Sequence, residues 1–149
     1  MSQSGFRTLR FGYESGDKRY RADTNGKVSK KELEEKIAYI LKSGFTGADV
    51  GVYVMAGLIN QTPGDVLRDM EFVASQRVKV KPVFLSPVPH TPLFKHYAVH
   101  YPRLETDPLF HNDSFFIAQL PGWDHAGMQQ VIDVSKKFNA KLEIKVETA

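Results

Sequence analysis

The sequence predicts an α/β fold that forms part of a larger barrel: a partial (half) TIM-like barrel with parallel strands and crossover helices. Strand-like and helix-like segments alternate over residues 8–92, and connections of helical length between successive strands require parallel pairing. The central strand segment, Asp49–Leu58, is apolar almost throughout, as strands buried on both faces are. No glycine-rich phosphate loop follows a strand, so an arc of a barrel explains the pattern better than a self-contained Rossmann unit.

The first strand and helix have clear boundaries. Thr8–Glu14 is a β-prone run that ends at the turn residues Ser15–Asp17, and the polar stretch Lys18–Val28 predicts a loop. Ser29 and Glu32 then form a capping box. The apolar residues after it recur with helical spacing, and a glycine follows where a left-handed C-cap is expected; these residues are Leu33, Ile37, Ile40, Leu41 and Gly44.

The second and third units repeat this arrangement. After the strand Asp49–Leu58, Thr62 precedes Pro63 as an N-cap precedes a first-turn proline, which predicts a second helix. Val78–Leu85 predicts the third strand, and the proline-broken segment Ser86–Pro92 ends it.

Residues 93–149 show weaker periodicity. We expect a short helix over Leu93–Val99, a long loop over Tyr101–Asp113, a fourth strand over Ser114–Leu120, a helix capped by Asp124, and an edge strand over Leu142–Val146. Residues 1–149 are therefore interpreted as one domain, with three β/α units in 1–92 and a C-terminal extension in 93–149.

Composition excludes several protein classes. A content of 42% hydrophobic and 25% charged residues excludes a disordered tail, a coiled coil and a collagen-like repeat. No apolar run is long enough to span a membrane, and the N-terminus lacks a secretory pattern, so we expect a cytoplasmic location and no membrane partner. The net charge of +3 is spread among interspersed acids, a pattern that does not favour nucleic-acid binding.

The chain contains no cysteine. Disulfides, thiolate nucleophiles, cysteine-based zinc sites and cysteine ligation of an iron–sulfur cluster are therefore impossible for this polypeptide.

Four ordered segments resemble radical S-adenosylmethionine (radical SAM) enzymes. Thr8–Gly16, with its glycine, acid and Ser-Gly ending, is similar to their fourth-strand segment. Asp49–Thr62 is similar to their fifth strand, and Lys81–Phe94 to their sixth, while Asp107–Asp113 resembles a stretch found after the barrel in some iron–sulfur oxidoreductases of this class. The order and spacing of the four segments, over most of residues 5–113, carry the resemblance.

The resemblance implies a parent enzyme that uses S-adenosylmethionine on a 4Fe-4S cluster. In that family a CxxxCxxC loop binds the cluster, which lets a 5′-deoxyadenosyl radical abstract hydrogen from the substrate. The cysteine loop precedes the strands matched here. We therefore expect this chain to be the C-terminal half of such a barrel, inactive alone, with the upstream cluster-binding half as its partner.

The resemblance also implies a nucleoside site at the strand ends, with no catalytic and no metal-ligating residue in this chain. Glu14 and Ser15 would face the ribose, since a carboxylate at a strand end can accept hydrogen bonds from two hydroxyls and barrel sites lie at those ends. The adenine would lie against Gly51, Tyr53, Gly57, Phe84, Leu85 and Ser86. Ile59 and Asn60 depart from the family's Pro-Gly, and His90 from its Pro-Gly-Thr glycine.

Plainer interpretations stay open beside these. Arg10 and Glu14 share a strand face, so a structural ion pair is the alternative for Glu14. The anion-binding N-terminus at Thr62 is a further alternative. Four histidines could chelate a metal or be unrelated surface residues: His90, His96, His100 and His111. Trp123 could stack on a base or pack in the core.

The alternative function is that of a stand-alone, non-catalytic interaction domain. An isolated half-barrel exposes strand edges, which tend to pair with other chains. We therefore expect the isolated chain to form a homo-oligomer.

Overall fold

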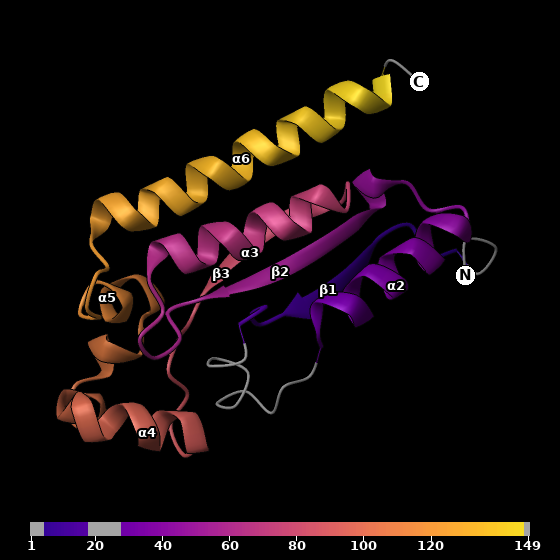
Figure 1. The fold of residues 1–149 in the computed structure, drawn as a ribbon. Coiled ribbons are helices and arrows are strands. Elements are labelled where there is room, and N and C mark those ends of the chain that lie inside the picture. The colour runs from indigo at the N-terminus through magenta and orange to yellow at the C-terminus, as the bar shows by residue number, and fades with distance from the viewer. Residues whose placement is uncertain (1–4, 18–27, 148–149) are drawn as a thin grey trace.

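The computed structural model describes residues 5–17 and 28–147, so nearly all of the predicted loop Lys18–Val28 lies outside the described residues. Its centre is a parallel three-stranded sheet in the order β1-β2-β3 (Figure 1). The predicted α/β fold with crossover helices is therefore confirmed, and the sequential strand order is that of an arc of a barrel. The elements of this arc are β1 (Leu9–Tyr13), α2 (Lys30–Lys42), β2 (Val50–Ala56), α3 (Pro63–Ser75) and β3 (Lys79–Phe84).

The caps predicted from the sequence define both crossover helices. At α2, Ser29 and Glu32 make both bonds of the capping box, and Gly44 after the helix has a φ of 96°. At α3, the Thr62 side chain accepts a hydrogen bond from the Asp65 N–H, and Pro63 occupies the first turn. Both helices begin within one residue of their predicted starts.

Within the described residues, one face of the sheet is covered by helices and the other is open. On β2, Val50, Val52 and Val54 are fully buried, and they pack with the apolar residues of α2 and α3 in the core. Because side chains alternate along a strand, Tyr53 faces the other side and is 38% exposed. We call this side the open face; the strand register places Gly12, Tyr53, Met55 and Val83 on it.

The outer edge of β3 is closed by α6 (His125–Glu147), which packs against β3 and α3. The Asn139 amide accepts a hydrogen bond from the Val80 N–H at 2.8 Å and donates one to the Val80 carbonyl at 2.9 Å. Pro82 lies two residues on, at the next position that points outward, and has no N–H to offer. In the described sheet, β1 is therefore the edge where a further strand can add.

The C-terminal extension is more helical than the sequence predicts. The predicted short helix is confirmed as α4 (Pro92–His100), and the predicted loop over Tyr101–Asp113 contains the 3-10 turns η3 (Pro102–Glu105) and η4 (Pro108–His111). Outside this extension, one more 3-10 turn, η2 (Gly47–Asp49), lies directly before β2.

Two predicted strands in this extension are wrong. Ser114–Leu120 contains most of helix α5 (Asp113–Ile117), because the Asn112 side chain accepts from the Phe115 N–H and starts a helix. Leu142–Val146 continues α6, the helix that follows Asp124 as predicted. The Asp124 side chain accepts a hydrogen bond from the Gly127 N–H at 2.7 Å.

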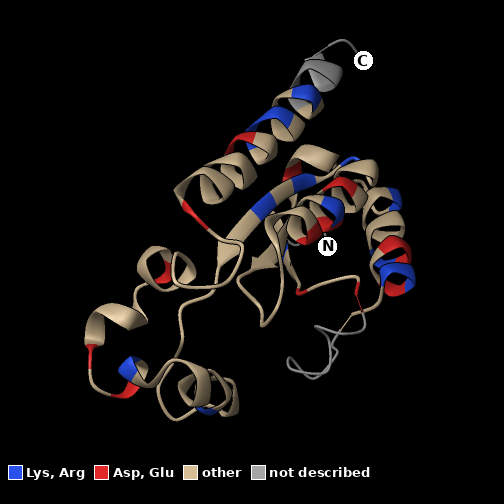
Figure 2. Ribbon diagram, turned by 60° about the vertical axis from the view of Figure 1, so that its left-hand side comes forward, with Lys and Arg blue, Asp and Glu red and all other residues tan. Residues whose placement is uncertain are grey.

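Charged residues are distributed as the sequence indicates. Figure 2 shows acidic and basic positions interspersed along α2 and α6. None of the helices within the described ranges combines the length and apolar character needed to cross a membrane.

Candidate functional site

The open face holds a cavity of about 410 Å³ at the carboxyl end of β1. Tyr53, Met55 and Val83 supply apolar walls, and Glu14, directly after β1, supplies a carboxylate. A cavity of this size falls in the usual range of roughly 300–1,000 Å³ for small-molecule sites. The arrangement can hold a flat apolar group with hydroxyls directed at the carboxylate.

The structure brings together two of the predicted site residues, Glu14 and Tyr53. Sequence reasoning did not single out Met55, which lies within the expected stretch 51–57, and it missed Val83, which lies opposite Met55 in the β2–β3 register. The period of two along a strand could have found both, because Met55 shares a face with Tyr53.

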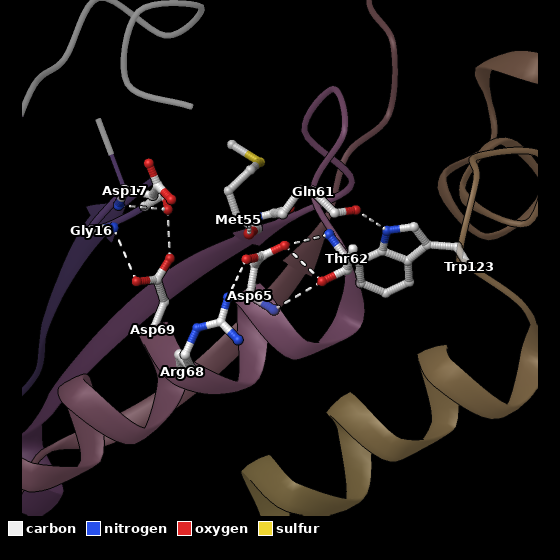
Figure 3. Close-up of polar contacts among 10 residues, drawn as sticks. Gly16, Asp17, Met55, Gln61, Thr62, Asp65, Arg68, Asp69 and Trp123 are labelled. Carbon is white, nitrogen blue, oxygen red and sulfur yellow. Dashed lines mark hydrogen bonds and ion pairs between the residues drawn. The ribbon is translucent and has the colours of Figure 1, made fainter. Parts of the chain in front are cut away.

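Ser15 and the following turn are bonded to α3. The Ser15 hydroxyl donates to Oδ2 of Asp69 at 2.6 Å, and the Gly16 N–H donates to Oδ1 at 3.0 Å (Figure 3). Burial raises the pKa of the Asp69 carboxyl, although these two donors and Lys30 oppose the rise. The Ser15 hydroxyl is therefore directed to α3, and its predicted contact with a ribose stays a prediction.

Gly57 and the loop after β2 are fixed by hydrogen bonds. Gln61 is buried, and its side-chain oxygen accepts from the N–H groups of Gly57 and Leu58 at 2.9 and 3.1 Å, while its amide donates to the Met55 carbonyl. The Trp123 indole donates to the Gln61 carbonyl at 2.6 Å (Figure 3). Trp123 is a buried core residue, which favours the packing interpretation.

The remaining predicted site residues lie apart from the open-face cavity. Phe84 packs edge-on against Trp123, and Leu85 is buried beside Gly57. The Ser86 hydroxyl donates to the His111 carbonyl. Gly51 lies near the other end of β2, where a Cβ would come within 2.9 Å of the Arg10 side chain.

The Arg10 side chain reaches from β1 to the residue directly before β2. Its guanidinium donates to the carbonyls of Leu9 and Asp49, at 2.9 and 3.1 Å. Arg10 therefore bonds to backbone carbonyls, whereas Glu14 borders the cavity.

The N-terminus of α3 already holds an acid. Asp65 accepts hydrogen bonds from the Thr62 N–H and hydroxyl at 2.8 and 2.6 Å, and Arg68 pairs with it. The Asp65 carboxylate thus takes both Thr62 donors and places a negative charge at this helix N-terminus, which argues against the anion site considered at Thr62.

The four histidines lie on α4, in the turn before it and in η4. The His96 and His100 rings lie 6.1 Å apart on α4, while His111 Nε2 lies 2.7 Å from the Leu104 carbonyl. His90 occupies a left-handed position, with a φ of 68°, in the turn before α4. The part of the chain that the structure describes contains no cluster of three or more metal-ligating side chains.

Comparisons with known proteins find a likeness among solved structures but none among family profiles or curated sequences. No protein family profile and no curated protein sequence matches this chain. Among solved structures the chain is similar to coproporphyrinogen III oxidase (HemN) from Escherichia coli, described as a radical SAM enzyme, with 16% sequence identity and a TM-score of 0.47. The match covers 69% of this chain and 28% of that one, so the chain spans little more than a quarter of that enzyme's length.

Proposed function

We propose that this chain forms one arc of the barrel of a radical SAM iron–sulfur oxidoreductase, in which its open face contributes the nucleoside side of the S-adenosylmethionine site. The carrying observation is the open-face cavity, which Glu14 lines together with the apolar side chains of Tyr53, Met55 and Val83. Barrel enzymes build their sites at the carboxyl ends of parallel strands, and Glu14 directly follows β1.

The two edges of the sheet support this proposal. Asn139 and Pro82 close β3, whereas β1 is the edge at which the order β1-β2-β3 can continue. An upstream half would add its last strand parallel to β1 and would bring the open face toward the barrel interior. That half is the partner we propose for this chain.

The residues fit one part of the cofactor and not the other. A 149-residue chain without cysteine offers no thiolate to a 4Fe-4S cluster, so the cluster ligands would come from the partner half. The nucleoside fits better: Glu14 can accept from two ribose hydroxyls, while Tyr53 and Met55 can pack against the adenine. In radical SAM enzymes the bound S-adenosylmethionine supplies hydrogen-atom abstraction; this chain would bind and orient its nucleoside and exclude water.

Binding of 5′-deoxyadenosine tests the nucleoside site. We expect the ¹⁵N-labelled chain to bind it in the millimolar range, because the contacts of the partner half are missing, with shifts at the carboxyl ends of β1 and β2. Glu14→Gln should weaken binding about tenfold, since a charged acceptor is lost. The matched control, Glu105→Gln on exposed η3, should leave it unchanged. Equal affinities of Glu14→Gln and the wild type would contradict the assignment.

The coding sequence tests the relation to a larger barrel. A CxxxCxxC motif within about 200 residues upstream, in the same or an adjacent reading frame, is the expected result. Its absence would count against the radical SAM proposal and favour the second candidate, a stand-alone interaction domain, which the single open edge of β1 supports.

A further inference from the structure

A second cavity, separate from the open face, lies between the β2–α3 loop, α4 and the turn before α6. Its volume is about 290 Å³, and Leu58, Tyr97 and Leu120 form buried parts of its wall. It opens beyond the carboxyl end of β2, the end at which ligands of parallel α/β sheets bind.

The walls of this cavity are held in place before any ligand binds. The Tyr97 hydroxyl donates to the Gly57 carbonyl at 2.5 Å, which ties α4 to the loop. Gln61 and Trp123 hold the same loop from the core side through the bonds described above. Since the loop is fixed on both sides, little ordering would be needed on binding.

The loop also contains a sparsely populated backbone conformation. Asn60, at the rim of the cavity, has a φ of 60°. Asparagine is the non-glycine residue best suited to the left-handed region, so this position fixes the turn at the rim of the cavity.

The chemistry of the lining restricts the ligand. The walls are aliphatic and aromatic, and His100, Tyr101 and Asn60 add groups that both donate and accept hydrogen bonds. Burial raises the pKa of the Tyr101 hydroxyl, so it remains a donor. Among the residues that the structure describes, no lysine, arginine, aspartate or glutamate lines the cavity, so a charged ligand would be desolvated without a counter-charge.

We propose that this cavity binds a small neutral aromatic or heteroaromatic molecule carrying an amide-like donor and acceptor, with His100 as its polar anchor. The proposal does not rest on the radical SAM assignment, because no residue of the open-face cavity takes part in it.

Benzamide and benzoate, a neutral and an anionic ring of the same shape, are suitable probes. Titration of the ¹⁵N-labelled chain with benzamide should give saturable shifts at the residues that line the cavity. Benzoate should bind at least about fivefold more weakly, because a carboxylate loses its hydration there. Benzamide shifts confined to the open face, or equal affinity for both probes, would overturn the proposal.

Two exposed histidines of α4 provide a matched pair of variants. His100→Ala should weaken benzamide binding about fivefold by removing one hydrogen bond. His96→Ala, one turn earlier and outside the lining, should not change it. Both side chains are exposed, so neither substitution should disturb folding, and circular dichroism checks this. Equal effects of the two variants would contradict the role of His100.

Discussion

At the scale of single residues, Asp69 is an acid whose pKa is raised by burial and lowered by its hydrogen bonds. It is 5% exposed, and its two donors come from the turn that follows β1, more than fifty residues earlier. It fixes the backbone next to Glu14 and so positions the open-face carboxylate without touching the cavity. Gly16 permits this approach, since a Cβ there would lie 2.8 Å from Oδ1 of Asp69.

The raised pKa of Asp69 predicts a distinct pH dependence of stability. Its contribution is fully present below the ordinary value of 3.8 and is lost as the pH rises through the folded-state pKa. The stability advantage of the wild type over Asp69→Asn should therefore shrink between pH 4 and pH 7. Urea unfolding at four pH values in this range measures it.

Asp49 provides a control of opposite sign. The Thr46 hydroxyl and N–H lower the pKa of its carboxyl, so its contribution is present above the ordinary value and is lost as the pH falls. The advantage of the wild type over Asp49→Asn should shrink from pH 5 to pH 3. A decline in the same direction for both variants would contradict these assignments.

Gly57 is required for two separate reasons. Its φ is 97°, and a Cβ would overlap Cδ1 of Ile117. Gly57→Ala should lower the free energy of unfolding by about 3 kcal/mol, combining left-handed strain with overpacking. Gly122→Ala, with a φ of 79° and open space around it, should cost only about 1 kcal/mol. Chemical denaturation of both variants separates the two causes, and equal losses would exclude the Ile117 overlap.

At the scale of elements, α6 stabilises the edge of the sheet through Asn139. Its side-chain amide makes the two backbone hydrogen bonds to Val80 that a neighbouring strand would make. Asn139→Ala removes both hydrogen bonds to Val80. We expect a loss of about 1–3 kcal/mol in the free energy of unfolding, because a backbone N–H and carbonyl are left unsatisfied. Gln130→Ala, at an exposed position of the same helix, is the control and should be near neutral. A loss no larger than that of the control would show that α6 does not seal this edge.

Elements were predictable where local chemistry and tertiary packing agree. The capping residues Ser29 and Thr62 mark the starts of two helices whose apolar residues are buried in the core. The apolar run over residues 49–58 identifies the central strand. The strands predicted over Ser114–Leu120 and Leu142–Val146 were wrong. A short apolar or alternating run also fits a helix when a capping residue or a preceding helix starts one. The Asn112 cap of α5 could have been recognised from the sequence. Residues 142–146 follow the predicted helix directly, and that continuity of α6 could have excluded a strand there.

The candidate site was less predictable than the fold. Glu14 was expected from its strand end and Tyr53 from the family resemblance. Contacts between residues distant in sequence, such as Ser15 with Asp69, depend instead on how α3 packs over β1. Local patterns do not contain that information. For the same reason the sequence could not show that Phe84 and Ser86 would take partners in the C-terminal extension.

At the scale of the whole molecule, the sheet has one closed edge and one edge available for pairing. Edge strands that lack cover tend to pair with other chains, and pairing through a single edge gives a closed dimer, whereas two open edges would permit longer assemblies. We therefore expect the homo-oligomer to be a dimer formed through β1.

Strand alternation identifies the groups that would make this dimer. Leu85 donates to the Ala56 carbonyl, so even-numbered residues of β2 bond to β3 and odd-numbered residues bond to β1. With Gly12 opposite Tyr53 in the register, Arg10 and Gly12 are the β1 residues whose backbone groups point outward. Gly12→Pro would block this edge as Pro82 does on β3, without removing a β1–β2 hydrogen bond.

Light scattering at micromolar concentration should therefore give a dimer mass for the wild type and a monomer mass for Gly12→Pro. Gly12 is exposed, and nothing lies within 4 Å of the position that a Cβ would take, so the variant should fold. A monomeric wild type would contradict pairing through β1, and a dimeric Gly12→Pro would move the interface to another surface, such as the open face. If the upstream half is the natural partner, its addition should dissociate the wild-type dimer, because both compete for the same row of backbone groups.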